Sequence, residues 1–275
     1  MPQTINTNIL SMNAQRNLNA SQASLSTSVQ RLSSGMRINS AKDDAAGLAI
    51  SERMSSQVRG MNVAIRNAND GVSLAQTAEG AIGQVSNMLQ RMRELAVQSA
   101  NATNSSGDRS NLDSEFQQLA SEITRTLAGT KFNGTAILAG GAGAQVFQVG
   151  ANNGDTVTIT TTNLSTDADI TAVTGGDITS VANANTALTD IDTALSTVNT
   201  ERATYGAVNA RFDSIIATLE VSAENLAASR GRIVDADFAQ ETANLSRTQI
   251  LQQAGSAMVA QANRQPQQVL SLLQR

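Results

Sequence analysis

The stretch that decides the fold is IGQVSNMLQRMRELAVQS, at residues 82–99. Its buried-type positions alternate by steps of three and four, at Ile82, Val85, Leu89, Met92, Ala96 and Ser99. Side chains with this spacing lie on one face of an α-helix. The pattern therefore predicts a long helix, which we expect to begin in the low forties and to end at the polar residues 101–107.

A similar stripe comes before this helix. Apolar residues fall at steps of seven, four, three and four, and SerSerGly at 33–35 interrupts them: Leu18, Leu25, Val29, Leu32 and Met36. Ser40, with Asp43 three residues later, has the spacing of a capping box that opens the next helix. The first 100 residues are thus predicted to form two helices joined by a short connection.

Three further helices are predicted beyond residue 107. The first has apolar positions from Leu112 to Leu127 and ends at Gly129. Another alternates by four and three from Val208 to Ile233. The last runs from about residue 235, with Leu251 and Met258 on its stripe, and is expected to stop near Pro266.

The middle of the chain differs in kind. Residues 138–185 are rich in Gly, Thr, Asn and Asp, and QVFQV at 145–149 and TVTIT at 156–160 flank Asn153 and Gly154. Two alternating runs around an Asn-Gly pair predict a β-hairpin. The predicted fold class is mainly α: a long antiparallel helical rod with a small central β-hairpin region and the N- and C-termini paired at one end.

Composition narrows the function. Aromatic residues make up 2% of the chain and apolar residues 40%, so thin helices suit it better than a thick core. Cys and His are both absent, which removes thiol nucleophiles, imidazole bases and the usual zinc sites. The net charge is −4 with scattered Lys and Arg, so no nucleic-acid groove is predicted. We expect no cofactor, no metal, no signal peptide and no membrane span.

The remaining motifs have ordinary structural explanations. Carboxylate pairs such as Asp43 with Asp44 fit helix starts, where they stabilise free N–H groups, better than they fit a hydrolase or a calcium loop. The Gly cluster at 140–143 precedes a strand instead of opening a helix, so a turn explains it better than a phosphate site. The sequence therefore predicts no enzyme.

Residues 90–98, QRMRELAVQ, put Arg91 and Leu95 on adjacent turns, with Arg93 and Glu94 expected on other faces. Charge and an exposed apolar residue would share one surface. A solvated helix face and a binding patch are both open on this pattern alone.

The two ends of the chain are harder to explain as parts of a monomer. Each terminal segment is about 40 residues long, and small or polar residues dominate both. Such a pair buries too little apolar area to offset the entropy of ordering it. The chain also ends on VLSLLQR, which is apolar although termini are usually polar. We therefore expect other copies of the chain to cover the ends.

Four stretches closely resemble bacterial flagellin: RLSSGMRINSAKDDAAGLAISERM at 31–54, RNANDGVSLAQTAEGAI at 66–82, LQRMRELAVQSAN at 89–101, and SRTQILQQAGSAMVAQANRQPQQVLSLL at 246–273. The resemblance covers about the first 140 and the last 90 residues. It implies a subunit of the extracellular flagellar filament, exported unfolded through the flagellar type III apparatus.

The resemblance also implies domains. Residues 1–43 with 235–275 would be the inner coiled-coil domain, disordered in the monomer. Residues 44–137 with 186–234 would be the rod domain, and 138–185 a short β-rich variable region. The implied assembly and sensor contacts lie in the terminal segments: Leu18, Leu25, Val29, Leu32, Leu251, Met258, Val269, Leu270, Leu272 and Leu273.

The implied partners are other copies of the chain, an export chaperone, filament cap and junction proteins, and host flagellin receptors. The segment that the flagellin-sensing Toll-like receptor recognises matches Gln90, Arg91 and Leu95, with Glu115 as the acidic partner. The resemblance thus favours the binding patch over the solvated face, and Met92 departs from the Val often found there. Two rivals stay open: a hook-filament junction protein, and a secreted receptor ligand that does not assemble.

Overall fold

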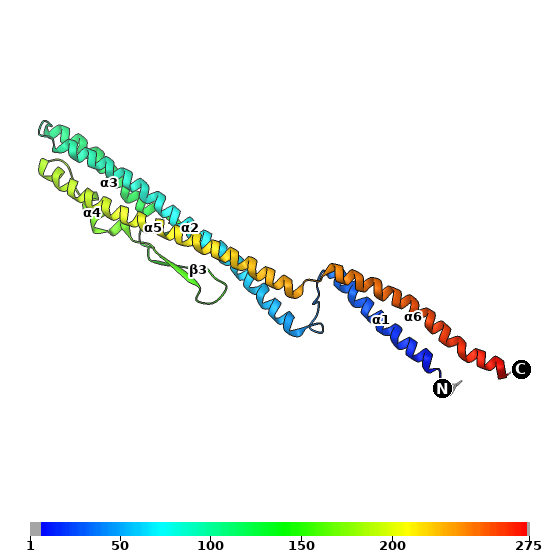
Figure 1. The fold of residues 1–275 in the computed structure, drawn as a ribbon. Helices are drawn as coiled ribbons and strands as arrows, with labels where there is room; N and C mark the ends of the chain where they lie inside the picture. The colour runs from blue at the N-terminus through cyan, green and yellow to red at the C-terminus, as the bar shows by residue number, and fades with distance from the viewer. Residues whose placement is uncertain (1–6, 274–275) are drawn as a thin grey trace. The chain divides into compact units, whose positions relative to one another are not determined.

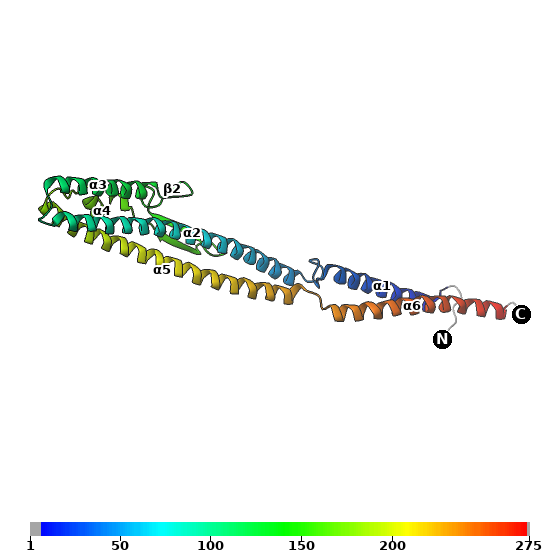
Figure 2. The same ribbon diagram turned by 90° about the horizontal axis from the view of Figure 1, so that it is seen from above.

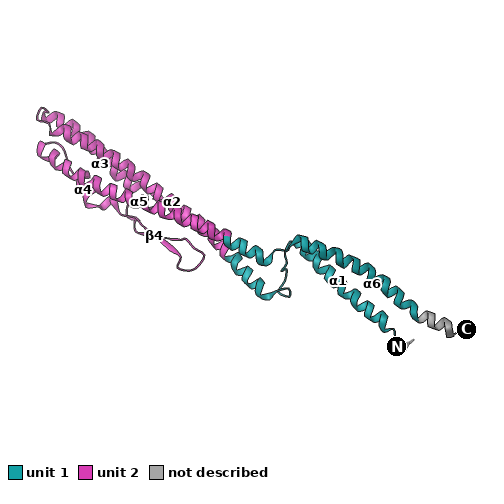
Figure 3. Cartoon of the chain, in the orientation of Figure 1, with its two compact units in different colours: residues 1–56, 225–275 teal, residues 57–224 magenta. Residues whose placement is uncertain are grey.

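The structure is a computed structural model that describes the backbone of residues 7–273 and the side chains of residues 7–265. The chain forms two compact units, residues 1–56 with 225–275 and residues 57–224, coloured separately in Figure 3. We call them the terminal unit and the central unit. Helices α2 (Ala45–Ala100) and α5 (Val181–Val234) contribute residues to both.

The terminal unit is built on α1 (Ile9–Ser34) and α6 (Phe238–Leu273), which lie side by side in Figures 1 and 2. Asn8 opens α1, because its side chain accepts a hydrogen bond from the Ser11 N–H. Gly35 ends the helix in the left-handed conformation, with φ of 71°. The prediction that SerSerGly interrupts this helix is confirmed.

The start of α2 corrects one prediction. Asp43 accepts hydrogen bonds from the backbone N–H groups of Asn39 and Ser40, so it closes the preceding turn. The residue that caps α2 is Asp44, whose Oδ1 accepts from the Gly47 N–H at 2.8 Å. The capping-box prediction at Ser40 and Asp43 was therefore wrong, because the Ser-x-x-Asp contacts form one turn before the helix begins.

Two short connections meet in the terminal unit, residues 35–44 and 235–237. Met36 and Asp235 form an isolated antiparallel bridge, in which Ala236 N donates to Gly35 O at 2.9 Å and Arg37 N to Val234 O at 2.6 Å. We call this contact the bridge. The helix that follows, α6, extends to Leu273, so the prediction that it stops near Pro266 was wrong. A proline removes one helical hydrogen bond and bends a helix without always ending it.

The central unit packs α2 antiparallel to α5. Arg93 on α2 bonds Asp192 on α5, and Gly71, earlier on α2, lies under the Phe212 ring, later on α5. Helix α3 (Ser106–Gly129) follows α2, and its capping box joins Ser105 and Asp108. These helices share a core whose largest fully buried side chains are Tyr205, Phe116, Phe212, Ile82, Leu89, Met92, Leu95, Ile123, Leu127, Ile137, Leu138 and Ile159.

The short strands confirm the hairpin prediction. Strands β3 (Ala144–Gln148) and β4 (Thr156–Thr160) pair antiparallel, with Phe147 opposite Val157. Strands β1 (Lys131–Phe132) and β2 (Thr135–Ala136) form a smaller hairpin around Asn133 and Gly134, both at positive φ. A 3₁₀ turn, η1 (Leu164–Thr166), and the short helix α4 (Ala168–Thr174) follow, and the sequence pattern did not predict them.

The predicted fold class, mainly α with a small central β-hairpin region, is confirmed. The domain boundaries at residues 43, 137, 185 and 234 stay a prediction. They describe where the chain would divide in an assembly, which the two compact units of one molecule do not test.

Candidate assembly surface

The strongest functional feature is the α1–α6 pair. The two helices run antiparallel, since Ser11 contacts Asn263 near one end and Ser28 contacts Glu241 near the other. Between these contacts Leu18 lies against Gly255, where an added Cβ would come within 3.1 Å of Leu18 Cδ1. The backbones approach closely at that point because Gly255 has no side chain.

The seam between the two helices has a strict heptad pattern and is half polar. On α1 its buried or half-buried positions include Ser11, Ala14, Leu18, Ser21, Leu25, Ser28 and Leu32. On α6 they include Glu241, Leu245, Thr248, Gln252, Gly255, Val259 and Ala262. Steps of three and four on both helices are those of a coiled coil, but Ser, Thr, Gln and Glu bury little apolar area.

Many of the larger apolar side chains of this pair lie outside the seam. Those of α1 and α6 that are exposed are Ile9, Leu10, Met12, Val29, Phe238, Ile250, Leu251 and Met258. Met258 is 63% exposed and Leu251 49%, and both lie on the stripe that the sequence predicted along α6. Within one molecule the seam uses the neighbouring line of α6 through Gly255 and Val259, so the role of Leu251 and Met258 as assembly contacts stays a prediction.

Part of this exposed surface is hollowed. A groove of about 450 Å³ runs along the pair, lined on α1 by Leu10, Ala14 and Leu18 and on α6 by Leu251 and Met258, among others. Leu18, Leu25 and Leu32 sit half-buried in the seam, and Val29 is 51% exposed. The assembly residues predicted between 18 and 258 thus divide into a seam set and an exposed set. Val269, Leu270, Leu272 and Leu273 lie outside the described side chains.

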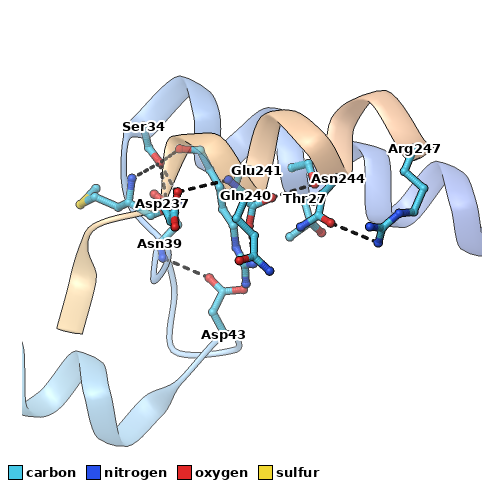
Figure 4. A network of polar contacts seen from close by, with 12 residues as sticks. Thr27, Ser34, Asn39, Asp43, Asp237, Gln240, Glu241, Asn244 and Arg247 are labelled. Carbon is cyan, nitrogen blue, oxygen red and sulfur yellow. Dashed lines mark hydrogen bonds and ion pairs between the residues drawn. The ribbon is translucent and has the colours of Figure 1, made fainter. Parts of the chain in front are cut away.

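Near the bridge, a polar network ties α1 to α6 (Figure 4). The Glu241 carboxylate accepts hydrogen bonds from Ser28 Oγ and Arg31 Nη1, both at 3.0 Å. Glu241 is only 7% exposed, and the Arg31 guanidinium, followed by the Ser28 hydroxyl, holds its pKa below the ordinary value against the opposing effect of burial. Nothing in the sequence spacing singled out this network.

The comparisons with known proteins decide the family. The model of the bacterial flagellin N-terminal helical region matches residues 5–142, and that of the bacterial flagellin C-terminal helical region matches residues 188–273. The chain belongs to the bacterial flagellin family. Between the two matches, residues 143–187 of this flagellin fall outside both helical regions.

Similar flagellins span the whole chain. It is 47% identical to the flagellin of Halalkalibacterium halodurans over 269 residues, which is 98% of this chain and 99% of that one. It is 36% identical to flagellin 1 of Proteus mirabilis over an alignment of 365 residues, covering 99% of this chain and all of that one. Since this chain has 275 residues, the second alignment opens long gaps in it.

A solved structure is also similar. The crystal structure of Bacillus cereus flagellin shares 36% sequence identity, with a TM-score of 0.51 over 60% of this chain and 94% of that one. This likeness agrees with the mainly helical fold.

The predicted receptor patch lies on α2 and α3 of the central unit. Arg91 donates to Glu115 Oε1 on α3 at 2.9 Å and to Glu94 Oε2 at 2.8 Å. These hydrogen bonds, the one to Glu94 first, hold the pKa of Arg91 above its ordinary value. Gln90, Arg91 and Glu115 are all exposed, so the structure brings three of the four predicted residues to one surface.

Two expectations about this patch were wrong. Leu95 is 1% exposed and belongs to the core, because it lies one turn beyond Met92 on the buried face of α2. Glu94 shares the surface of Arg91 instead of lying on another face, as their ion pair shows. Sequence reasoning missed Val97, which is 51% exposed and lines a shallow depression with Gln90, Arg93 and Glu94. Its spacing from Gln90 and Glu94 could have shown it.

No described helix is long and apolar enough to cross a membrane. Within the described residues, no three His, Cys, Asp or Glu side chains gather as metal ligands would.

Proposed function

We propose that this flagellin is the structural subunit of the extracellular flagellar filament, and that α1 and α6 complete their burial against neighbouring copies of the chain. The observation that carries this proposal is the distribution of side chains in the α1–α6 pair. Its seam is half polar, while Ile, Leu, Met and Phe side chains are exposed on its outer surface. Exposed apolar patches of this kind mark interaction sites. A helical homopolymer supplies a covering surface at every subunit.

The same observation supports an inner domain of residues 1–43 with 235–275 that is disordered in the free monomer. A seam rich in Ser, Thr and Gln gives little free energy to offset the entropy of ordering two long helices. Export as an unfolded chain through the type III apparatus, with an export chaperone on the C-terminal helix, fits this weakness. Filament cap and junction proteins would meet the same surfaces at the two filament ends.

Flagellins are a structural family, and we propose that this chain has no enzymatic activity. Its chemistry supports that reading, because it has no His and no Cys. Metal-dependent proteolysis by the purified chain would contradict it.

Seeded polymerisation tests the proposal. Filament seeds are mixed with purified chain, and elongation is followed by sedimentation and electron microscopy. Replacing Leu251 and Met258 by Ser should raise the critical concentration at least about tenfold while leaving the melting of the soluble monomer unchanged. The matched control replaces Val181, an exposed apolar residue of the central unit, by Ser and should elongate normally.

The same assay addresses the terminal leucines and the rival functions. A chain lacking residues 266–275 should fail to elongate seeds if Val269, Leu270, Leu272 and Leu273 are intersubunit contacts. A junction protein would add to a filament end without unlimited growth. A receptor ligand that does not assemble would leave the seeds unchanged.

A second candidate function, recognition by host flagellin receptors, is favoured by the surface around Arg91. We propose that Gln90, Arg91 and Glu115 contact the flagellin-sensing Toll-like receptor, with Leu95 supporting Arg91 from the core instead of touching the receptor. A guanidinium fixed by two carboxylates loses little conformational entropy on binding, which suits an interface anchor.

Receptor-reporter cells test this proposal with soluble monomer. Arg91→Ala should reduce signalling at least about tenfold, since Arg anchors dominate interface energies. Arg125→Ala, which removes a similar exposed ion pair on α3, is the matched control. Equal signalling by both variants would contradict a role for Arg91. Cytosolic flagellin sensors would read Leu270, Leu272 and Leu273, and substituting these three should abolish that response only.

A further inference from the structure

The heptad pattern of the α1–α6 seam does not by itself specify one alignment of the two helices. Its positions repeat every seven residues on both helices, so sliding one helix by a heptad, ~10 Å, brings seam positions opposite seam positions again. Apart from Glu241, the residues that change places are Ser, Ala, Leu, Thr, Gly, Val and Gln, none of them aromatic or charged. Apolar packing therefore discriminates weakly between registers, and a further interaction is needed to favour one of them.

One charged position on the seam is unique. Glu241 is the single carboxylate of the two helices, since α1 has no Asp or Glu and α6 has no other. Its side chain retains only 9% of its exposure, and its partner Arg31 is also partly covered, with 30%. A carboxylate so placed needs its hydrogen bonds, because leaving it buried and unpaired is strongly unfavourable.

The observed register gives that carboxylate a hydroxyl and a guanidinium together, from Ser28 and Arg31. A slide by seven residues one way would put Glu241 opposite Leu25 and Ser21, where Arg31 does not reach it. The opposite slide would carry it beyond Ser34, the end of α1, and leave Arg31 facing Thr248. Both alternatives lose the hydrogen bonds that Ser28 and Arg31 donate to Glu241.

We propose that Glu241, held by Ser28 and Arg31, is a register lock that selects one alignment of α1 against α6 when the terminal helices order in the filament. The proposal rests on the filament function proposed above. It assigns Glu241 a role in specificity: a polar residue inside a coiled-coil seam fixes register at some expense of stability. Two other features compete for this role, the bridge between Met36 and Asp235 and the close approach at Gly255.

The geometry supplies a direct reporter of register. An ideal Cβ on Gly255 lies 3.7 Å from Leu18 Cβ, within the 3.5–4.5 Å range of disulfides. The Leu18→Cys change also removes the Cδ1 atom that would crowd the new side chain. Because the chain has no Cys of its own, the introduced pair holds the only thiols.

The experiment oxidises assembled filaments of three double-cysteine chains and separates intrachain from interchain disulfides on non-reducing gels. Leu18→Cys with Gly255→Cys reports the observed register. Leu18→Cys with Thr248→Cys, or with Ala262→Cys, reports a slide of one heptad either way. With the lock intact, the intrachain yield at 18 and 255 should exceed both slid pairs at least about tenfold.

Glu241→Leu is then added to each reporter. An apolar residue there keeps or increases helix pairing, while Arg31 turns to solvent. Filaments should still form, but the intrachain disulfide yield at 18 and 255 should exceed the yields of the slid pairs by no more than about threefold. Glu241→Gln, which keeps the shape and the hydrogen-bonding oxygen, should restore part of the preference. Glu122→Leu is the matched control, since it removes an exposed carboxylate paired within α3.

An unchanged tenfold preference in Glu241→Leu filaments would overturn the proposal and assign the register to the bridge or to Gly255. Interchain disulfides as the main product would also overturn it, because the lock would then join two subunits. If the Glu241→Leu chain does not elongate seeds, the disulfide yields of the Glu241→Gln and Ser28→Ala chains are compared instead.

Failure of the unmodified chain to elongate seeds would instead contradict the filament function. The soluble chain would then be cross-linked, and its intrachain disulfide yields would test the register proposal.

Discussion

Both units are built on antiparallel helices, but they differ in where their large apolar side chains lie. In the central unit, α2, α3 and α5 bury a core that includes Phe116, Tyr205 and Phe212, and its exposed large apolar residues are all Val. In the terminal unit, the buried large apolar side chains among the described residues are Ile38 and Val234, while Ser11, Ser28, Thr248 and Glu241 are also buried. One unit hides its apolar surface and the other presents it.

This difference indicates how stability is distributed in a subunit that must assemble. We expect the central unit to be stable without neighbouring copies, because it buries most of its large apolar side chains within one chain. On the proposed function, the terminal unit completes its burial against neighbouring copies, so we expect its order to depend on concentration and on neighbours. Stability and assembly are therefore carried by different residues, and substitutions should separate them.

The largest effect should come from Phe212 in the central core. Its ring is fully buried, lies over Gly71 and meets Phe147 edge to face at 5.9 Å. Phe212→Ala should lower the free energy of unfolding of the soluble monomer by about 3–5 kcal/mol. Urea unfolding followed by circular dichroism measures this, with Val221→Ala, on the exposed side of α5, as the control. An unchanged midpoint for Phe212→Ala would show that the terminal unit supplies more stability than its burial suggests.

A smaller loss should follow from Arg109→Ala at the end of α2. The guanidinium donates to three backbone carbonyls that α2 and its loop leave open, those of Ser99, Asn101 and Asn104, at 2.8–2.9 Å. Losing these bonds should lower the unfolding free energy by about 1–2 kcal/mol. Arg109→Lys should recover only part, since a single ammonium cannot reach three carbonyls with the same geometry. Equal melting of Arg109→Ala and the parent would contradict the capping role.

The two units also differ in how far the sequence predicted them. The core stripe from Ile82 to Ser99 and the hairpin around Asn153 and Gly154 followed from spacing and turn chemistry, because both are local rules. The α6 seam did not: the sequence pattern showed a stripe through Leu251 and Met258, whereas the seam with α1 passes through Gly255. A helix pair that must be covered on several sides has more than one apolar line, and periodicity cannot say which line faces which partner.

The candidate sites show the same limit. The pairing of Arg91 with Glu115 crosses from α2 to α3, and only the resemblance to flagellins suggested it. The Glu241 network joins residues more than 200 positions apart, and a lone Glu among Ser and Thr carries no spacing signal. The burial of Leu95 could have been predicted from the sequence, because Leu95 lies one turn after Met92 on the same face of the helix.

Acid should weaken the terminal unit through Glu241. Arg31 first, and then Ser28, hold the pKa of this carboxyl below its ordinary value of 4.5. A lowered pKa means that its stabilising effect is full above the ordinary value and is lost as the pH falls through the folded-state value. The critical concentration of Glu241→Gln filaments should thus exceed that of the parent most at neutral pH, and the gap should close as the pH falls below about 4.5. A gap independent of pH would contradict a charged lock.

The smallest effect should come from the ion pair of Arg93 with Asp192, which joins α2 to α5 at 2.7 Å. Arg93 holds the pKa of Asp192 below its ordinary value, yet both side chains are about half exposed, at 47% and 56%. Water and salt screen such a pair, and ordering two side chains offsets much of the attraction. Asp192→Asn should shift the melting midpoint of the monomer by less than ~2 °C, and 1 M salt should remove the difference. A larger shift would mean that exposed polar contacts help to hold the central unit together. The difference between the Arg93–Asp192 pair and the Arg31–Glu241 pair would then come from the apolar residues around each pair, and not from how deeply each pair is buried.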